Sequence, residues 1–168
     1  SMAHRAIICA SLADGKSVIS NVDYSQDILA TMDAMRTLGA AIQQIDNTLH
    51  IQGIKNFHHL QDTHIHCKES GSTLRFLIPL FSLCNQEITF HGEGRLLKRP
   101  QKVYEDIFQK QGLPFIQDEQ GIRITSSLHA DTFVLQGDVS SQFVSGLLFT
   151  LPLLPKDSTI QILPPFES

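Results

Sequence analysis

The sequence predicts an α/β (α+β) chain made of three related units that form one domain over residues 1–168, arranged around a pseudo-threefold axis. Two observations lead to this fold class. An order of helix, strand, helix, strand, strand occurs over 1–54 and recurs over 71–127, about 70 residues later, and a shorter copy follows over 132–163. Each unit also contains a helix that is apolar nearly all round, and such helices are buried.

The first unit contains five segments: a helix over 1–15, a strand over 17–22, a helix over 25–40, and strands over 41–46 and 48–54. Gly15 is expected to stop the first helix. Ser25 is expected to cap the second, which is amphipathic, and Gly39 to end it. The last two strands alternate in polarity and read as a hairpin that turns near Asn47.

The second unit repeats this order: a helix over 71–84, a strand over 87–92, a helix over 99–112, and strands over 113–120 and 121–127. Arg75 stands in its helix where Arg5 stands in the first. Pro100 lies near the start of the second helix and Gly112 at its end, as their preferences favour. The hairpin is expected to turn at Gln120 and Gly121.

The third unit is shorter. It contains a strand over 132–138, an apolar helix over 140–155 and a strand over 158–163. We expect this unit to be incomplete at the C-terminus. No Pro-, Gly- or Ser-rich linker separates the units, which is why we expect one domain.

Composition limits the function classes. The 168 residues suffice for a hydrophobic core, and 42% apolar with 18% charged residues excludes a disordered chain. A net charge of −4 argues against a general binder of nucleic acid or of anionic membranes. No apolar run reaches the ~18 residues of a membrane span, and no secretory leader is expected. Three cysteines without a C-x-x-C motif predict a reduced, cytoplasmic protein.

The starts of the three apolar helices are rich in small polar residues: Ser1, then Ser70, Gly71, Ser72 and Thr73, then Ser140, Ser141 and Gln142. A helix start carries unpaired N–H groups and about half a positive charge, so it attracts anions. Around a pseudo-threefold axis, the three starts would emerge on one face.

Arginines strengthen this interpretation. Arg5 and Arg75 lie one turn into their helices, and the loop 92–100 adds Arg95, Lys98 and Arg99. A buried guanidinium without a partner is costly, whereas at a pocket it binds phosphate or carboxylate bidentately. The residues therefore predict a site for a phosphorylated small molecule with several negative charges, with or without a carboxylate. Simpler readings remain: serines as plain helix caps, the loop as solvated surface, and Arg75 paired with Glu69 or Asp138.

Four segments resemble, in order, motifs of the EPSP synthase (3-phosphoshikimate 1-carboxyvinyltransferase) family. They are SMAHRA (1–6), SGSTLRF (70–76), GEGRLLKRP (92–100) and GDVSSQFVSGLL (137–148). The resemblance implies one lobe of the two-lobed enolpyruvate transferase fold, an inside-out α/β barrel. Each lobe has three βαβαββ units with buried parallel helices, and the active site lies between the lobes. Because family members are much longer, we expect an excised lobe.

The resemblance also implies roles for single residues. Shikimate 3-phosphate would contact Ser1, Arg5, Ser140, Ser141, Gln142 and Ser168. Phosphoenolpyruvate would contact Gly71, Arg99 and Gln142, with pocket support from Ser72, Thr73 and Arg75. Glu69 departs from the family, which usually has asparagine there. A carboxylate beside an anion site is unfavourable unless it turns away or pairs with Arg75 or Lys68.

The family adds the shikimate 5-hydroxyl to the enol ether carbon of phosphoenolpyruvate, and the tetrahedral intermediate then loses phosphate. The acid–base residues are expected in the second lobe, the implied partner of this chain, so this chain would position anions without completing the chemistry. No cofactor, metal, nucleic acid or membrane is implied.

Three alternatives stay open. The sister enzyme that transfers enolpyruvate to UDP-N-acetylglucosamine shares the fold, but it has a reactive cysteine in the loop that corresponds to 92–100, where this sequence has none. A metal-binding module could use His64, His66 and Cys67, with His58 and His59 upstream, although no second pair has a zinc spacing. A stand-alone anion-binding domain is the third, against which the truncated third unit argues.

Overall fold

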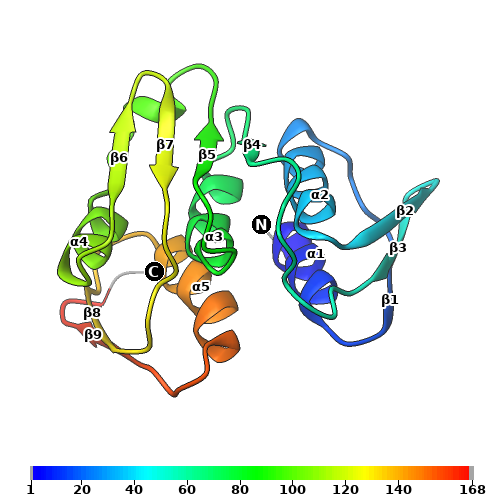
Figure 1. The fold of residues 1–168 in the computed structure, drawn as a ribbon. Helices are drawn as coiled ribbons and strands as arrows, with labels where there is room; N and C mark the ends of the chain where they lie inside the picture. The colour runs from blue at the N-terminus through cyan, green and yellow to red at the C-terminus, as the bar shows by residue number, and fades with distance from the viewer. Residues whose placement is uncertain (1, 167–168) are drawn as a thin grey trace.

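Three small sheets, one from each unit, make up the β-structure of the described residues (Figure 1). The computed structural model describes residues 2–166, so the predictions for Ser1 and Ser168 lie outside the described residues. The first sheet has the order β1-β3-β2 and is antiparallel: β1 (Lys16–Ile19), β2 (Ala41–Ile45) and β3 (Thr48–Gln52).

The second sheet has the order β4-β5-β7-β6, and the third consists of β8 and β9. Their strands are β4 (His64–His66), β5 (Ile88–His91), β6 (Phe115–Asp118), β7 (Gly121–Ile124), β8 (Thr132–Gln136) and β9 (Thr159–Leu163). The pairs β4–β5 and β8–β9 are parallel, whereas β7 pairs antiparallel with both of its neighbours.

The pairings confirm the three related units. The antiparallel order β1-β3-β2 matches β5-β7-β6, and the parallel pair β8–β9 matches β4–β5. Among residues 2–166, the second unit alone contains both the parallel pair and the antiparallel three-stranded order, in the chain order β4-α3-β5-α4-β6-β7. The prediction placed no strand at the start of this unit, and β4 is that strand.

Residues 2–166 contain five α-helices: α1 (Met2–Leu12), α2 (Gln26–Leu38), α3 (Gly71–Ser82), α4 (Lys102–Lys110) and α5 (Ser141–Thr150). Two short 3-10 helices are also present in this range: η1 (Leu96–Lys98) follows β5, and η2 (Leu151–Leu153) follows α5. The predicted ends of α2 are confirmed, because the Ser25 side chain accepts the Ile28 N–H and Gly39 takes a φ of 124°.

Prolines shorten two of the predicted helices. The prediction of one helix over 140–155 is wrong, because α5 ends at Thr150 and gives way to η2, which contains Pro152. The helix expected from residue 99 begins only at Lys102. Arg99 precedes Pro100 and takes an extended ψ of 135°, the conformation favoured before proline.

The apolar helices are buried as predicted, and α3 and α5 lie side by side near the centre of Figure 1. Ile7 and Ile8 of α1, Leu77 of α3 and Leu147 of α5 are all fully buried. Their burial is the main source of the fold's stability, since each such side chain contributes roughly 1.5–3 kcal/mol. Among the described residues, none of the helices combines the length and hydrophobicity that a bilayer crossing needs.

Candidate functional site: three helix starts

The starts of α3 and α5 are joined by one glutamine side chain. Gln142 of α5 donates from Nε2 to the Ser72 hydroxyl at 2.8 Å, and its Oε1 accepts from Arg75 Nη1 at 3.3 Å. Ser72 and Arg75 both belong to the first turns of α3. Gln142 therefore contacts two other residues predicted for the anion site, although 70 residues separate it from Ser72.

The start of α1 reaches the same place through Arg5. Its guanidinium donates to the Ser145 hydroxyl of α5, and its Cζ lies 5.0 Å from the centroid of the Phe76 ring on α3. An aromatic face attracts a guanidinium and restricts its orientation. Arg5 is thus held by two neighbouring helices, and no carboxylate within residues 2–166 forms an ion pair with it.

Arg75 is held in a similar way. Its Cζ lies 4.8 Å from the centroid of the Phe143 ring, and its buried Nε has no hydrogen-bond partner in the part of the chain that the structure describes. Burial lowers the pKa of the Arg75 guanidinium, and the charge of Arg99 lowers it further. The proximity of two positive charges is unfavourable in the free protein and favours an anion between them.

A proline fixes the backbone beneath Arg75. Pro79 lies inside α3 and has no N–H to donate to the carbonyl of Arg75, four residues earlier. The buried Tyr104 hydroxyl of α4 donates to that carbonyl instead. Gly146 of α5 makes room for this contact, because a Cβ there would lie 2.2 Å from the Tyr104 hydroxyl oxygen and 2.5 Å from the Arg75 carbonyl oxygen.

Arg99 lies directly beside Gly71. A Cβ added to Gly71 would be 3.1 Å from Arg99 Nη1, so the two residues predicted to bind the same ligand are adjacent. Glu69 turns toward the loop that carries Arg99: its Oε1 would lie 2.2 Å from a Cβ on Gly94, whose φ is 61°. The carboxylate therefore packs against Gly94.

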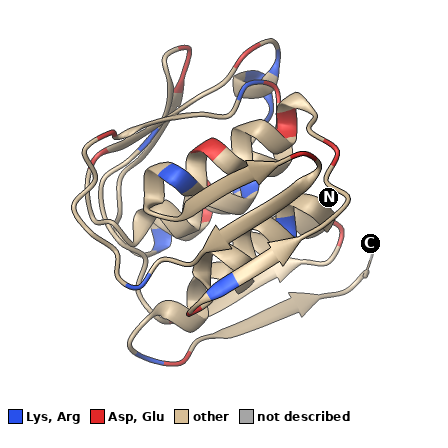
Figure 2. Cartoon of the chain, turned by 90° about the vertical axis from the view of Figure 1, so that its right-hand side faces the viewer, with Lys and Arg blue, Asp and Glu red and all other residues tan. Residues whose placement is uncertain are grey.

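No carboxylate neutralises the site arginines within residues 2–166. Three ion pairs occur there, Arg36 with Asp33, Lys102 with Asp106 and Arg123 with Asp118. The alternative in which Arg75 pairs with Glu69 or Asp138 is wrong for the described residues. Figure 2 shows acidic and basic residues interspersed along the ribbon, so the net charge of −4 leaves room for a local cationic site.

Some of the serines are helix caps, as the simpler reading expects. The Ser140 side chain accepts the Gln142 N–H at 3.3 Å, and the Ser70 side chain accepts the Thr73 N–H at 3.0 Å. Ser141 is exposed as the first residue of α5. Thr73 is fully buried, with its hydroxyl bonded inside the protein to Ser70.

Sequence reasoning missed the residues that hold the arginines in place: Ser145, Phe76, Phe143 and Tyr104. One signal for Ser145 was available. It occupies in α5 the position that Arg5 and Arg75 occupy in their helices. Because equivalent positions face the same pseudo-threefold axis, the repeat could have predicted that Ser145 lies near these arginines. The aromatic contacts depend on side-chain packing between helices and leave no trace in the spacing.

The metal-binding alternative gains no support. His64 and His66 lie with His91 on the exposed face of β4 and β5, and His64 Nδ1 is 2.8 Å from His91 Nε2 in a hydrogen bond. Across residues 2–166, no group of three or more His, Cys, Asp or Glu side chains is arranged to hold a metal ion.

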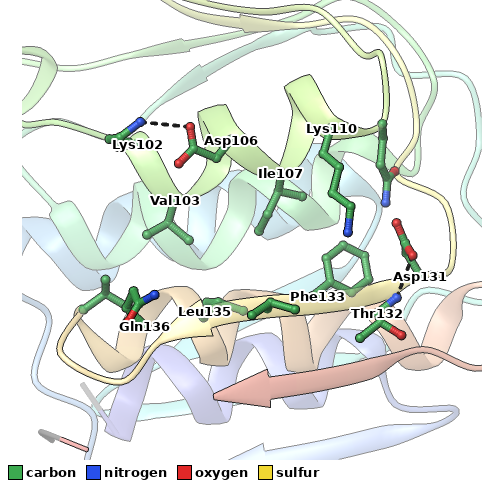
Figure 3. Close-up of a pocket in the computed structure, with 13 residues that line it drawn as sticks. Lys102, Val103, Asp106, Ile107, Lys110, Asp131, Thr132, Phe133, Leu135 and Gln136 are labelled. Atoms are coloured by element: carbon green, nitrogen blue, oxygen red, sulfur yellow. Dashed lines mark hydrogen bonds and ion pairs between the residues drawn. The ribbon is translucent and has the colours of Figure 1, made fainter. Parts of the chain in front are cut away.

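A groove of about 410 Å³ lies between α4 and β8, apart from the helix starts (Figure 3). Val103 and Ile107 face Phe133 and Leu135 across it, and Lys102 at its rim pairs with Asp106 at 3.1 Å. No serine, glycine or arginine lines this groove. Its lining is mostly apolar between these charged side chains, which does not suit a small anion.

Comparison with known proteins shows the family to which this chain is similar. The family model for EPSP synthase (3-phosphoshikimate 1-carboxyvinyltransferase) matches residues 1–165. Curated relatives of that name include those of Clostridium kluyveri, 49% identical over 171 residues, and Clostridium perfringens, 50% identical over 173 residues. Both alignments cover 100% of this chain, which spans 40% of the relatives' length.

Solved structures show the same fold. EPSP synthase from Acinetobacter baumannii superposes with a TM-score of 0.81 at 21% identity, over 99% of this chain and 39% of that one. The enolpyruvyl transferase NikO from Streptomyces tendae superposes with a TM-score of 0.64 at 13% identity, over 95% and 38%. Motifs, repeat and family match lead to one conclusion: this chain belongs to the EPSP synthase family.

Proposed function

We propose that this chain is the substrate-binding lobe of an enzyme that transfers the enolpyruvyl group of phosphoenolpyruvate to the 5-hydroxyl of shikimate 3-phosphate. One observation carries the proposal. Arg5, Arg75 and Arg99 approach the joined starts of α1, α3 and α5 without an ion-pair partner among residues 2–166. Such a site suits two phosphorylated substrates, because guanidinium groups and helix starts both bind phosphate.

The two substrates divide the site between them. We assign shikimate 3-phosphate to Arg5, Ser140 and Ser141, and the resemblance adds Ser1 and Ser168, which lie outside the described residues. Phosphoenolpyruvate is assigned to Gly71 and Arg99, an assignment that their adjacency supports. Gln142, which joins the starts of α3 and α5, would contact both, with Ser72, Thr73 and Arg75 as pocket support.

The chain's share of the reaction is binding and orientation. Addition of a hydroxyl to the enol carbon needs a proton donor, a base and compensation of negative charge. The arginines and helix starts would supply the last of these and hold the reactants together. The proton-transferring groups are assigned to a second lobe of the same enzyme. The unpaired Cys9, Cys67 and Cys84 suit a reducing cytoplasm, where we place this function.

The test is a titration of isotope-labelled protein with shikimate 3-phosphate, followed by backbone amide shifts. We expect saturating shifts at Arg5, Ser140 and Ser141. UDP-N-acetylglucosamine is the control ligand and should produce none of them. A well-dispersed spectrum that does not respond to shikimate 3-phosphate would count against binding by this chain.

A second titration separates the two subsites. Arg99→Ala should weaken phosphoenolpyruvate binding while leaving shikimate 3-phosphate binding within about twofold. Arg123→Ala is the matched control, because Arg123 lies on β7 and its charge is already paired with Asp118 at 2.7 Å. If neither ligand responds to the loss of Arg99, the phosphoenolpyruvate assignment is wrong.

A further inference from the structure

A row of buried side chains joins the start of α1 to the start of α3 through the middle of α2. His4 Nδ1 lies 2.7 Å from the Thr31 hydroxyl, which lies 2.8 Å from the Thr73 hydroxyl. Thr73 in turn donates to the Ser70 hydroxyl at 2.8 Å. His4 is 5% exposed and the three hydroxyl residues are 0% exposed, so these hydrogen bonds are shielded from water.

The direction of the row follows from the number of protons. Each hydroxyl has one proton to donate. Thr73 directs its proton to the Ser70 hydroxyl at 2.8 Å or to the Asp27 carbonyl at 3.3 Å, and in both cases it must accept from Thr31. Thr31 has then used its own proton and must accept from His4 Nδ1. The imidazole is therefore the tautomer with the proton on Nδ1, and this tautomer fixes the polarity of the whole row.

Each end of the row lies beside one of the proposed subsites. His4 precedes Arg5, and the Phe76 ring contacts both, with its centroid 6.2 Å from that of His4 and 5.0 Å from Arg5 Cζ. At the other end, Ser70 caps α3 by accepting the Thr73 N–H and directly precedes Gly71. Neither His4 nor Thr31 is among the residues proposed to contact a ligand.

We propose that His4 and Thr31 are positioning residues that set the start of α1 against the start of α3, so that both anion subsites depend on one buried hydrogen-bond row. The identity of the ligands rests on the proposed function, whereas the tautomer and the row do not. A row with a single allowed direction suits this role, because one missing donor leaves several buried groups without partners. Packing alone would not require a particular tautomer.

The first measurement uses the unmodified protein and no ligand. Long-range ¹⁵N–¹H correlation reports which ring nitrogen of His4 carries the proton. We expect Nδ1 to be protonated and Nε2 to be unprotonated at pH 7.5. An Nε2–H tautomer, or a rapidly exchanging mixture, would overturn the proposal. This result is independent of whether any substrate binds.

The second measurement tests the dependence of the subsites on the row. Thr31→Val keeps the shape and removes the hydroxyl, and we expect the affinities for shikimate 3-phosphate and for phosphoenolpyruvate each to fall roughly tenfold, about 1.4 kcal/mol. Thr37→Val is the matched control. It lies on the same helix, is half-buried and makes no side-chain hydrogen bond within the described residues, so both affinities should stay within about twofold.

A pair of substitutions at His4 separates donor loss from packing. His4→Asn keeps an N–H near the position of Nδ1, so both affinities should stay within about threefold of those of the unmodified protein. His4→Leu removes the donor, so the affinity at each subsite should fall roughly tenfold. Normal affinities in a folded Thr31→Val or His4→Leu protein would refute the proposal. If the unmodified protein binds neither ligand while His4 has the expected tautomer, the proposed function of the isolated chain fails and the row stands.

Discussion

The contact between Tyr104 and the Arg75 carbonyl can be tested by removing one oxygen atom. Pro79 leaves this carbonyl without its helical donor, and the Tyr104 hydroxyl replaces that donor. Burial raises the pKa of Tyr104, so the hydroxyl keeps its proton. Tyr104→Phe should leave a buried carbonyl unsatisfied and lower the free energy of unfolding by about 1–3 kcal/mol.

A second substitution makes the reasoning specific. Pro79→Ala supplies an N–H four residues after Arg75, so the helix can satisfy the carbonyl by itself. In that background, Tyr104→Phe should cost less than about 0.5 kcal/mol, and the double-mutant cycle should show coupling of roughly 1–2 kcal/mol.

The assay is urea unfolding followed by circular dichroism, with the midpoint and slope fitted together. Tyr24→Phe is the matched control, because the Tyr24 hydroxyl is buried without a hydrogen-bond partner in the described residues and its loss should not destabilise the protein. Equal effects at Tyr104 and Tyr24, or an unchanged cost after Pro79→Ala, would refute the reasoning.

Three further predictions concern a ligand, the pH and a thiol. Gly71→Ala places a Cβ 3.1 Å from Arg99 Nη1 and should weaken phosphoenolpyruvate binding while shikimate 3-phosphate binding is retained; equal loss of both in titrations would contradict it. Burial lowers the pKa of His4 from 6.5, so the unfolded chain takes up a proton there before the folded protein does. The free energy of unfolding should therefore be highest well above pH 6.5 and should fall as the pH drops below 6.5. Urea unfolding at several pH values should show a weaker pH dependence for His4→Asn, and an unchanged dependence would contradict the prediction. Burial raises the pKa of the Cys67 thiol to about 12, so iodoacetamide at pH 8 should modify the exposed Cys9 and spare Cys67 until urea is added, and early labelling of Cys67 by mass spectrometry would contradict this.

The order of the elements could be predicted from the sequence because periodicity and capping residues act locally. Ser25 and Gly39 bound α2 as expected, since each acts within one turn of its own position. The strand β4 was missed as the opening strand of its unit because three residues are too few to establish an alternating pattern. The end of α5 was missed because the apolar pattern continues past Thr150 while Pro152 interrupts the hydrogen bonds.

For the candidate site, too, some residues could be predicted from the sequence and others could not. Arg5, Arg75 and the serine-rich starts could be found from their equal spacing in the repeats. Their neighbours could not be found, because the contact from Arg5 to Ser145 spans 140 residues and depends on how helices pack. The direction of the row from His4 to Ser70 likewise requires coordinates, since it follows from counting protons along contacts between three helices.

The unmatched arginines have a consequence for the ligand-free protein. Arg75 and Arg99 repel each other, and this repulsion persists in every folded molecule that has no anion bound. The fold is thus less stable than its packing alone would make it, and the missing stability returns when an anion arrives. Replacement of Arg99 by methionine should raise the melting temperature of the free protein while abolishing its response to phosphoenolpyruvate. The ligand-free protein therefore contains an unfavourable pair of positive charges, which a bound anion would offset.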